Sequence, residues 1–179
     1  MASEPQIGSI KFQYTVPLKP WDGDVELYTT EIEGEIGAYF GGDDDNDEKT
    51  VGRIKLLLVK LAEAFHDHAD LFCVLDAAGI EDLNLVLFDG DGLFNRDLRI
   101  EAEYGDLLVI ADLNLAPPFD DAGIVRQAIE TAIATFASLG VVVIPKNLLG
   151  LSVAERYKCG YRNIKRSDYL VRDNYKLRR

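Results

Sequence analysis

The sequence predicts an α/β (α+β) fold in which a mixed central β-sheet is flanked by helices on both faces. Three observations lead to this fold class. The second half alternates strand and helix patterns, the first half is mostly strand-like, and residues 107–115 form an apolar run with the length of a buried strand. Strands that alternate with amphipathic helices build sheets covered by helices. The 179 residues fit one domain, 1–179.

The N-terminal third has strand patterns. Apolar residues alternate with polar ones from Ile10 to Val16, which predicts a strand. Residues 25–40 are rich in β-branched and aromatic side chains but are broken by glycines, so they predict one bent strand or a hairpin. The Gly- and Asp-rich stretch near 41–50 predicts an acidic, mobile loop at a hairpin tip.

The middle of the chain predicts a change from strands to short helices. Residues 51–59 fit either a strand or a helix, and a strand that runs into a helix ending near Phe65 is favoured. Two short helices with apolar faces are predicted over 71–78 and 80–88. Residues 98–103 predict a short strand.

The second half predicts an alternation of strands and helices. Residues 107–115 are apolar on both sides, as in a central strand. Two adjacent ridges of apolar residues at i+4 spacing predict a helix over 124–137, buried across a wide face, and a glycine then ends it. Residues 141–144 predict a second core strand, residues 152–159 a short helix, and residues 161–171 a strand or hairpin.

The charge of the chain restricts its partners. The net charge of −12 argues against nucleic acid and anionic membranes, because binding phosphate backbones requires Lys and Arg. No apolar run approaches the roughly 18 residues of a membrane span, and the N-terminus lacks a signal-peptide pattern, so a cytoplasmic protein is expected. Residues 150–179 nevertheless hold nine of the 19 Lys and Arg residues. This basic region could attract a small anion or an acidic partner, or could pair with the acidic body.

No metal site or disulfide is expected. Cys73 and Cys159 are too few for a disulfide framework and predict two reduced thiols. His66 and His68 would point apart on a helix, and no further ligand lies near them in sequence. The acidic stretch 43–48 lacks the spaced Gly and final Glu of a calcium loop.

The most specific motif follows strand 107–115. It reads Leu115-Ala116-Pro117-Pro118-Phe119-Asp120-Asp121-Ala122-Gly123-Ile124. The segment resembles the acyl-CoA-binding segment of the GNAT superfamily of N-acetyltransferases, and the positions that match are Leu115, Pro117, Phe119, Gly123 and Ile124. The stretch from Ser152 to Tyr161 resembles the later helix of the same family, which ends in Gly-Phe.

The resemblance implies that acetyl-CoA or another acyl-CoA binds where two parallel strands part. The first strand would offer backbone groups to the pantetheine arm, and the turn and the helix N-terminus would offer N–H groups to the pyrophosphate. Independently of the resemblance, Asp120 or Asp121 is predicted to cap the N-terminus of that helix, because Asp is a preferred capping residue. The residues assigned to acyl-CoA are Leu113, Leu115, Asp120, Asp121, Ala122, Gly123, Ile124, Val125, Arg126 and Arg156.

Three of these positions depart from the family pattern. Asp120 stands where Arg or Gln is usual, Asp121 where Gly is usual, and Val125 where a small residue is usual. At an effective dielectric constant of ~20, two like charges 4 Å apart repel by about 4 kcal/mol before screening. If CoA binds, Arg126 and the basic C-terminal region are the candidates to neutralise its phosphates.

Asp112 and Tyr157 are the catalytic candidates. Asp112 is predicted to share one face of its strand with Leu108 and Ile110, where it could act as general base or simply be a polar residue at a bulge. The family's proton-donating Tyr lies four residues before the Gly, a position that Arg156 holds here. Tyr157 lies three before Gly160, so a shifted helix would be needed to place it.

Two functions follow from these patterns. The first is an acyl-CoA-dependent N-acyltransferase of the GNAT type that acts on an unknown amine. The alternative is a non-catalytic GNAT-like domain that has lost CoA phosphate binding and works by binding a protein or small-molecule partner. A homodimer is compatible with either.

Overall fold

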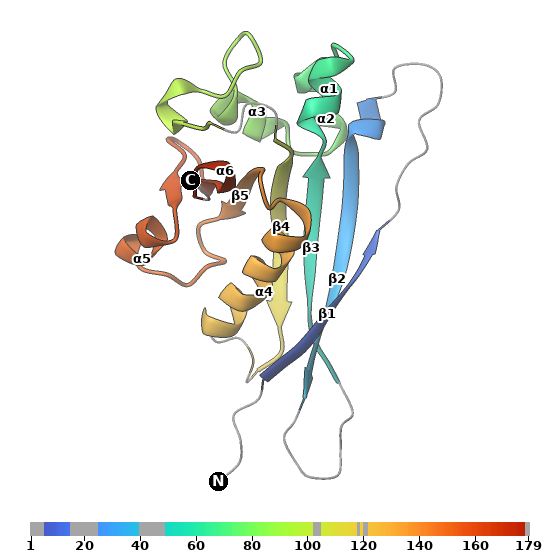
Figure 1. The fold of residues 1–179 in the computed structure, drawn as a ribbon, viewed down its shortest axis with the longest axis vertical. Helices are drawn as coiled ribbons and strands as arrows, with labels where there is room; N and C mark the ends of the chain where they lie inside the picture. The colour runs from blue at the N-terminus through green and yellow to red at the C-terminus, as the bar shows by residue number, and fades with distance from the viewer. Residues whose placement is uncertain are drawn as a thin grey trace.

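A mixed sheet of seven strands forms the centre of the protein in the computed structural model, which describes residues 6–14, 25–39, 49–101, 105–117, 119 and 122–177. The strands follow the order β1-β2-β3-β4-β5-β7-β6 (Figure 1). Their bounds are β1 Gln6–Tyr14, β2 Thr29–Tyr39, β3 Lys49–Val59, β4 Leu107–Leu115, β5 Val141–Pro145, β6 Tyr161–Asn163 and β7 Tyr169–Asp173.

Six α-helices and two 3₁₀ helices accompany the sheet in the described part of the chain. They are α1 Leu61–His66, α2 Leu71–Ala77, α3 Glu81–Leu87, α4 Ala122–Phe136, α5 Val153–Lys158 and α6 Asn174–Leu177, with 3₁₀ helices at Val25–Tyr28 and Arg96–Leu98. None of the helices in this described part is both long and apolar enough to cross a membrane.

One parallel pair divides two antiparallel halves of the sheet. Strands β1 to β4 form an antiparallel meander, and β5, β7 and β6 are antiparallel to one another. Strands β4 and β5 are parallel, and a parallel pair needs a long crossover connection, which α4 provides. The predicted order of strand, helix and strand in the second half is therefore confirmed.

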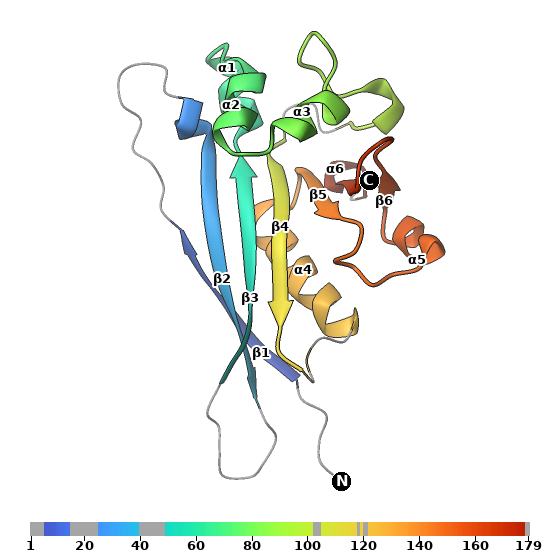
Figure 2. The same cartoon turned by 180° about the vertical axis from the view of Figure 1, so that it is seen from behind.

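Helices cover both faces of the sheet, as predicted. The 15-residue helix α4 buries Ile129 and Ile133 against one face, where they meet Ile54, Leu108 and Ile110. The opposite face carries α1, α2 and α3 over its upper end, which Figure 2 shows from behind. Below these helices the strands β2, β3 and β4 are not covered by any described helix (Figure 2).

Several element predictions are confirmed and others need correction. Residues 161–171 contain the predicted hairpin, and residues 25–39 form a single strand after a 3₁₀ turn. The strand predicted over 98–103 is wrong for its described residues, 98–101, which form no strand. Arg99 has a left-handed backbone (φ 50°), and its carbonyl accepts from the Arg162 side chain instead of a neighbouring strand. Helix α6 was not predicted, because its four residues are too short for a periodic pattern.

Some predictions fall on residues outside the described ranges. These are Val16, the acidic loop within 41–48, Glu103, and the helix cap at Asp120 or Asp121.

Candidate functional site

The two parallel strands part after a short contact. Strand β5 pairs with β4 only from Leu107↔Val141 to Val109↔Val143, whereas β4 continues to Leu115. Strand β5 ends at Pro145, which has no N–H to donate. Beyond Val109, the backbone edge of β4 that faces away from β3 therefore has no pairing with β5.

A β-bulge in β4 changes which side chains face each side. Lys55 of β3 pairs with Asp112 and Leu56 pairs with Ile110, so Ala111 is the extra residue. Leu108, Ile110 and Leu113 consequently all belong to the core beneath α4. Ile110 and Leu113 are separated by two residues instead of one, and because Ala111 is the extra residue of the bulge, their side chains point to the same face of the sheet.

The prediction that Asp112 shares a face with Leu108 and Ile110 is therefore wrong. Asp112 and Asn114 lie on the opposite face and are exposed. Asp112 lies across from Lys55, which is 3.7 Å from the Glu33 carboxylate on β2. The sequence carried a signal for this bulge, because the inward apolar positions change from even numbers at 108 and 110 to odd numbers at 113 and 115.

The turn after β4 is packed into the core beneath α4. Phe119 is 2% exposed and belongs to this core, while Ile124 and Val125 pack against it from the first turns of α4. Leu113 and Leu115 likewise use their side chains for packing. These residues could meet a ligand through their backbone groups. Gly123 and Arg126 are exposed, and the side chains of Asp120, Asp121 and Ala122 lie outside the described part.

Arg126 lies close to the start of the next helix. Its charge, together with that of Lys158, helps to lower the pKa of Glu155, although the main cause is the hydrogen bond from the Ser152 side chain. Ser152 and Glu155 form a capping box at the start of α5. The charge of Arg126 thus acts on the start of α5, and Arg126 has no ion pair among the described residues.

Arg156 is bound to the loop that follows β5. Its Nε donates to the carbonyl of Leu151 at 2.9 Å, and its Nη2 donates to the carbonyl of Lys146 at 3.0 Å. The guanidinium thereby connects α5 to the end of β5. Arg156 lies near the parting strands, and these bonds use two of its five N–H donors.

Tyr157 lies away from the parting strands. It is 59% exposed and lines a surface cavity with Arg99, Asp173 and Leu177, at the far side of α5. Asp173 pairs with Val141, which in turn pairs with Leu107, at the opposite end of β4 from Asp112. Arg156 contacts the loop after β5, whereas Tyr157 lies beside Asp173, so the structure does not bring the two catalytic candidates together.

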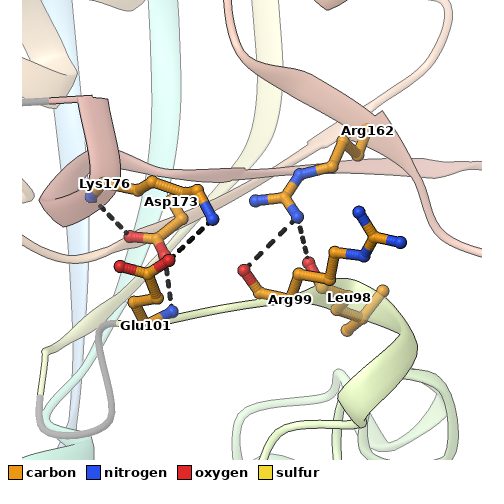
Figure 3. Close-up of polar contacts among 6 residues, drawn as sticks. All are labelled: Leu98, Arg99, Glu101, Arg162, Asp173 and Lys176. Atoms are coloured by element: carbon orange, nitrogen blue, oxygen red, sulfur yellow. Dashed lines mark hydrogen bonds and ion pairs between the residues drawn. The ribbon is translucent and has the colours of Figure 1, made fainter.

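In the described part of the chain, three of the nine basic residues in the C-terminal region form ion pairs with the acidic body. Arg162 donates to the carbonyls of Leu98 and Arg99, and Lys176 lies 2.6 Å from the Glu101 carboxylate (Figure 3). The Glu101 backbone N–H also donates to Asp173 at 2.6 Å (Figure 3). Two further ion pairs join Lys165 to Asp97 and Arg172 to Glu130.

These pairs leave few cations near the parting strands. Of the basic residues predicted to neutralise an anion, Arg126 is exposed and unpaired among the described residues, and Lys158 is exposed on α5. Within the described ranges, no three His, Cys, Asp or Glu side chains are grouped closely enough to hold a metal ion. Comparisons of the chain with protein-family models, curated proteins and solved structures gave no match.

Proposed function

We propose that this protein is a GNAT-type N-acyltransferase that transfers an acyl group from CoA to an amine. One observation carries the proposal: β4 and β5 are parallel, pair over three residue pairs, and then part, and the helix that connects them begins just beyond the free end of β4. The motif resemblance assigns acyl-CoA to this kind of strand junction. In this chain the motif, Leu115 to Ile124, begins at the end of β4 and continues into the start of α4.

The junction offers two kinds of contact to an acyl-CoA. The unpaired edge of β4 from Ile110 to Leu115 presents backbone N–H and C=O groups, which suit the amide groups of pantetheine. The N-terminus of α4 presents N–H groups and the positive end of a helix dipole, which suit the pyrophosphate. Arg126, in the second turn of α4, adds a positive charge.

The chemistry is an acyl transfer between sulfur and nitrogen. The amine nitrogen attacks the thioester carbonyl, the C–S bond breaks, and an amide and the CoA thiol are formed. A backbone N–H at the bulge around Ala111 would stabilise the oxyanion. Asp112, directly or through water, would accept the amine proton. Because Tyr157 lies elsewhere, the thiolate would take its proton from solvent.

Thermal unfolding with acetyl-CoA tests the proposal. A ligand present at 100 times its dissociation constant stabilises the folded protein by about 2.7 kcal/mol. ATP is the matched control, because it carries phosphates without the pantetheine arm that β4 would bind. Stabilisation by acetyl-CoA and CoA but not by ATP is expected. No stabilisation at millimolar acetyl-CoA would overturn the proposal.

The second candidate is a non-catalytic domain of the same fold. Two observations favour it: Asp120 and Asp121 are acidic where the family motif has Arg or Gln and Gly, and Arg156 stands where the family has its proton-donating Tyr. On this hypothesis, replacing Asp120 with Arg and Asp121 with Gly creates CoA affinity that the natural chain lacks. Turnover of acetyl-CoA by the natural chain with any amine would rule it out.

A further inference from the structure

A small cavity lies on the sheet face that α4 does not cover. Its volume is about 260 Å³, and the turn between α2 and α3 forms one wall. Leu57 and Val109 form an apolar floor, and Ile80 contributes to the wall. Gly79 permits this wall, because its left-handed backbone (φ +68°) ends α2 and turns the chain into α3.

The cavity carries carboxylates at the end formed by β2. Glu31 and Glu33 line this end together with Lys55 of β3. Lys55 lies 3.7 Å from Glu33, so these two charges largely compensate each other. The Glu31 side chain has no ion pair or hydrogen bond among the described residues, and its backbone pairs with Leu57 in the sheet. The lining therefore has one uncompensated negative charge, which favours one cationic group.

The other end of the cavity reaches the parting strands. Val109 is the last β4 residue that pairs with β5, and Ala111 is the bulged residue that follows. Both line the cavity. Asp112 comes next on β4 and lies across from Lys55, on the same face. A molecule in the cavity can thus extend from Glu31 on β2 to the edge of β4 beside Asp112.

We infer that this cavity holds the acceptor amine and selects an α,ω-diamine, an aliphatic chain with an amino group at each end. This inference rests on the proposed acyl transfer. One amino group, protonated, pairs with Glu31. The aliphatic chain crosses Leu57, and the second amino group, neutral, meets the thioester at Ala111.

The dimensions agree with a diamine of about five carbons. Strands β2 and β4 are two strand spacings apart, roughly 9–10 Å, and Ala111 lies two residues along β4 from Val109, the residue across from Glu31. The backbones at Glu31 and Ala111 are therefore roughly 12 Å apart, and the Glu31 side chain spans part of this distance. With bonds of about 1.5 Å, the nitrogens of extended 1,5-diaminopentane are about 7 Å apart, and a hydrogen bond to Glu31 adds about 3 Å. The cavity has room for about nine water-sized groups at ~30 Å³ each, and 1,5-diaminopentane has seven non-hydrogen atoms.

Calorimetry and acyl-transfer kinetics test the inference with four probes. These are 1,5-diaminopentane, pentylamine, 5-aminopentanol and 1,2-diaminoethane, each measured with the free protein and with the protein saturated by CoA. We expect 1,5-diaminopentane to bind about tenfold or more tightly than pentylamine and 5-aminopentanol, which lack the second charge. The shorter diamine cannot span the cavity and should bind about as weakly as pentylamine. Equal binding of all four would overturn the inference.

Two matched variants locate the effect. Glu31→Gln should abolish the preference for 1,5-diaminopentane over pentylamine. Glu35→Gln is the control, because Glu35 lies on the same face of the same strand but outside the cavity lining. It should leave the preference unchanged. An equal loss in both variants, or none in Glu31→Gln, would contradict the assignment of the ammonium group to Glu31.

The outcomes separate this inference from the proposed function. If acetyl-CoA stabilises the protein and acylation proceeds while Glu31→Gln leaves the preference intact, the inference fails and the proposed function stands. If the diamine binds through Glu31 but acetyl-CoA neither binds nor reacts, the acyl transfer fails and the cavity remains a diamine-binding site.

Discussion

Gly140 lies so close to Asp106 that a methyl group on its Cα would be 2.3 Å from the Asp106 carbonyl oxygen. The same oxygen accepts a hydrogen bond from the Val141 N–H at 2.9 Å. This contact joins the starts of β4 and β5, the two strands that part further along. Both strands begin directly after this point, so a shift here would disturb their pairing.

Gly140→Ala is therefore expected to lower the free energy of unfolding by about 1–3 kcal/mol, because backbone atoms must move to admit the methyl group. Gly90→Ala is the control, since a methyl group there meets nothing within 4 Å. Chemical denaturation of both variants measures the difference. Equal stability of the two variants would mean that the backbone at Asp106 moves to admit the methyl group with little loss of folding free energy.

Arg156 provides a second prediction, because its guanidinium binds two carbonyl groups of the loop after β5. Arg156→Ala should lower the free energy of unfolding by about 1–2 kcal/mol. Arg156→Lys keeps the charge but cannot reach both carbonyls, so it should be nearly as destabilised. Lys158→Ala, on the exposed side of the same helix, serves as the control. If Arg156→Lys is as stable as the natural protein, the hydrogen bonds contribute little.

Arg126 is the cation best placed to meet a phosphate at the start of α4. On the proposed function, Arg126→Ala should weaken CoA binding by about 1–3 kcal/mol, and the loss should shrink as salt rises, because the side chain is exposed. Calorimetry at low and high salt measures both effects. Arg166→Ala, on the turn between β6 and β7, should leave the affinity unchanged. Unchanged affinity in Arg126→Ala would remove this residue from the site.

Much of the fold could be predicted from local patterns. The apolar run 107–115 and the two ridges of 124–137 are long and periodic, and both elements are present with nearly the predicted bounds. Sheet order and partners are set by contacts between distant segments, which no local pattern encodes. The segment 96–101 illustrates this, because its conformation depends on side chains and backbone near 162, 173 and 176.

The site was harder to predict than the fold. A single extra residue, Ala111, moves Asp112 to the other face of β4. Side chains alternate between the two faces of a regular strand, so a prediction that does not include the bulge places Asp112 on the wrong face. The cavity beside it is formed by residues from β2, β3, β4 and the turn after α2. Glu31 was not singled out, because an exposed Glu on a strand has no distinguishing local signal.

Tyr161 provides a prediction at alkaline pH. Its side chain is buried, and its hydroxyl has no hydrogen-bond partner among the described residues. The Arg172 guanidinium lies over the ring, 5.4 Å from its centre, and its positive charge favours the ionised hydroxyl, which opposes the effect of burial. Burial dominates and raises the pKa of Tyr161 to about 12.

Tyr161→Phe should therefore not destabilise the protein at pH 7, and a gain of about 1 kcal/mol is expected from removing the unpaired hydroxyl. In the natural protein, the unfolded chain loses the tyrosine proton near pH 10 while the folded chain holds it to about 12, so stability falls across this interval. The Tyr161→Phe variant should lack this fall in stability, because it has no hydroxyl to ionise. Urea denaturation at pH 7 and pH 11 measures both effects, and a clear loss of stability at pH 7 would reveal a partner for the hydroxyl.

Asp106 provides a second pH-dependent prediction, in the acidic range. Burial is the main cause that raises the pKa of its carboxyl above the usual 3.8, and the neighbouring Glu63 adds to the rise while Lys60 opposes it. The folded protein thus holds this proton at pH values where the unfolded chain has lost it, and ionisation of Asp106 lowers stability as pH rises above 3.8. Asp106→Asn cannot ionise, so it should be more stable than the natural protein at pH 7, with an advantage that shrinks as pH approaches 3.8. Asp76→Asn, an exposed carboxylate on α2, is the control and should show no such trend. Denaturation curves between pH 4 and 7 measure the advantage, and one that grows toward acidic pH would show that the Asp106 carboxylate is stabilised in the folded state.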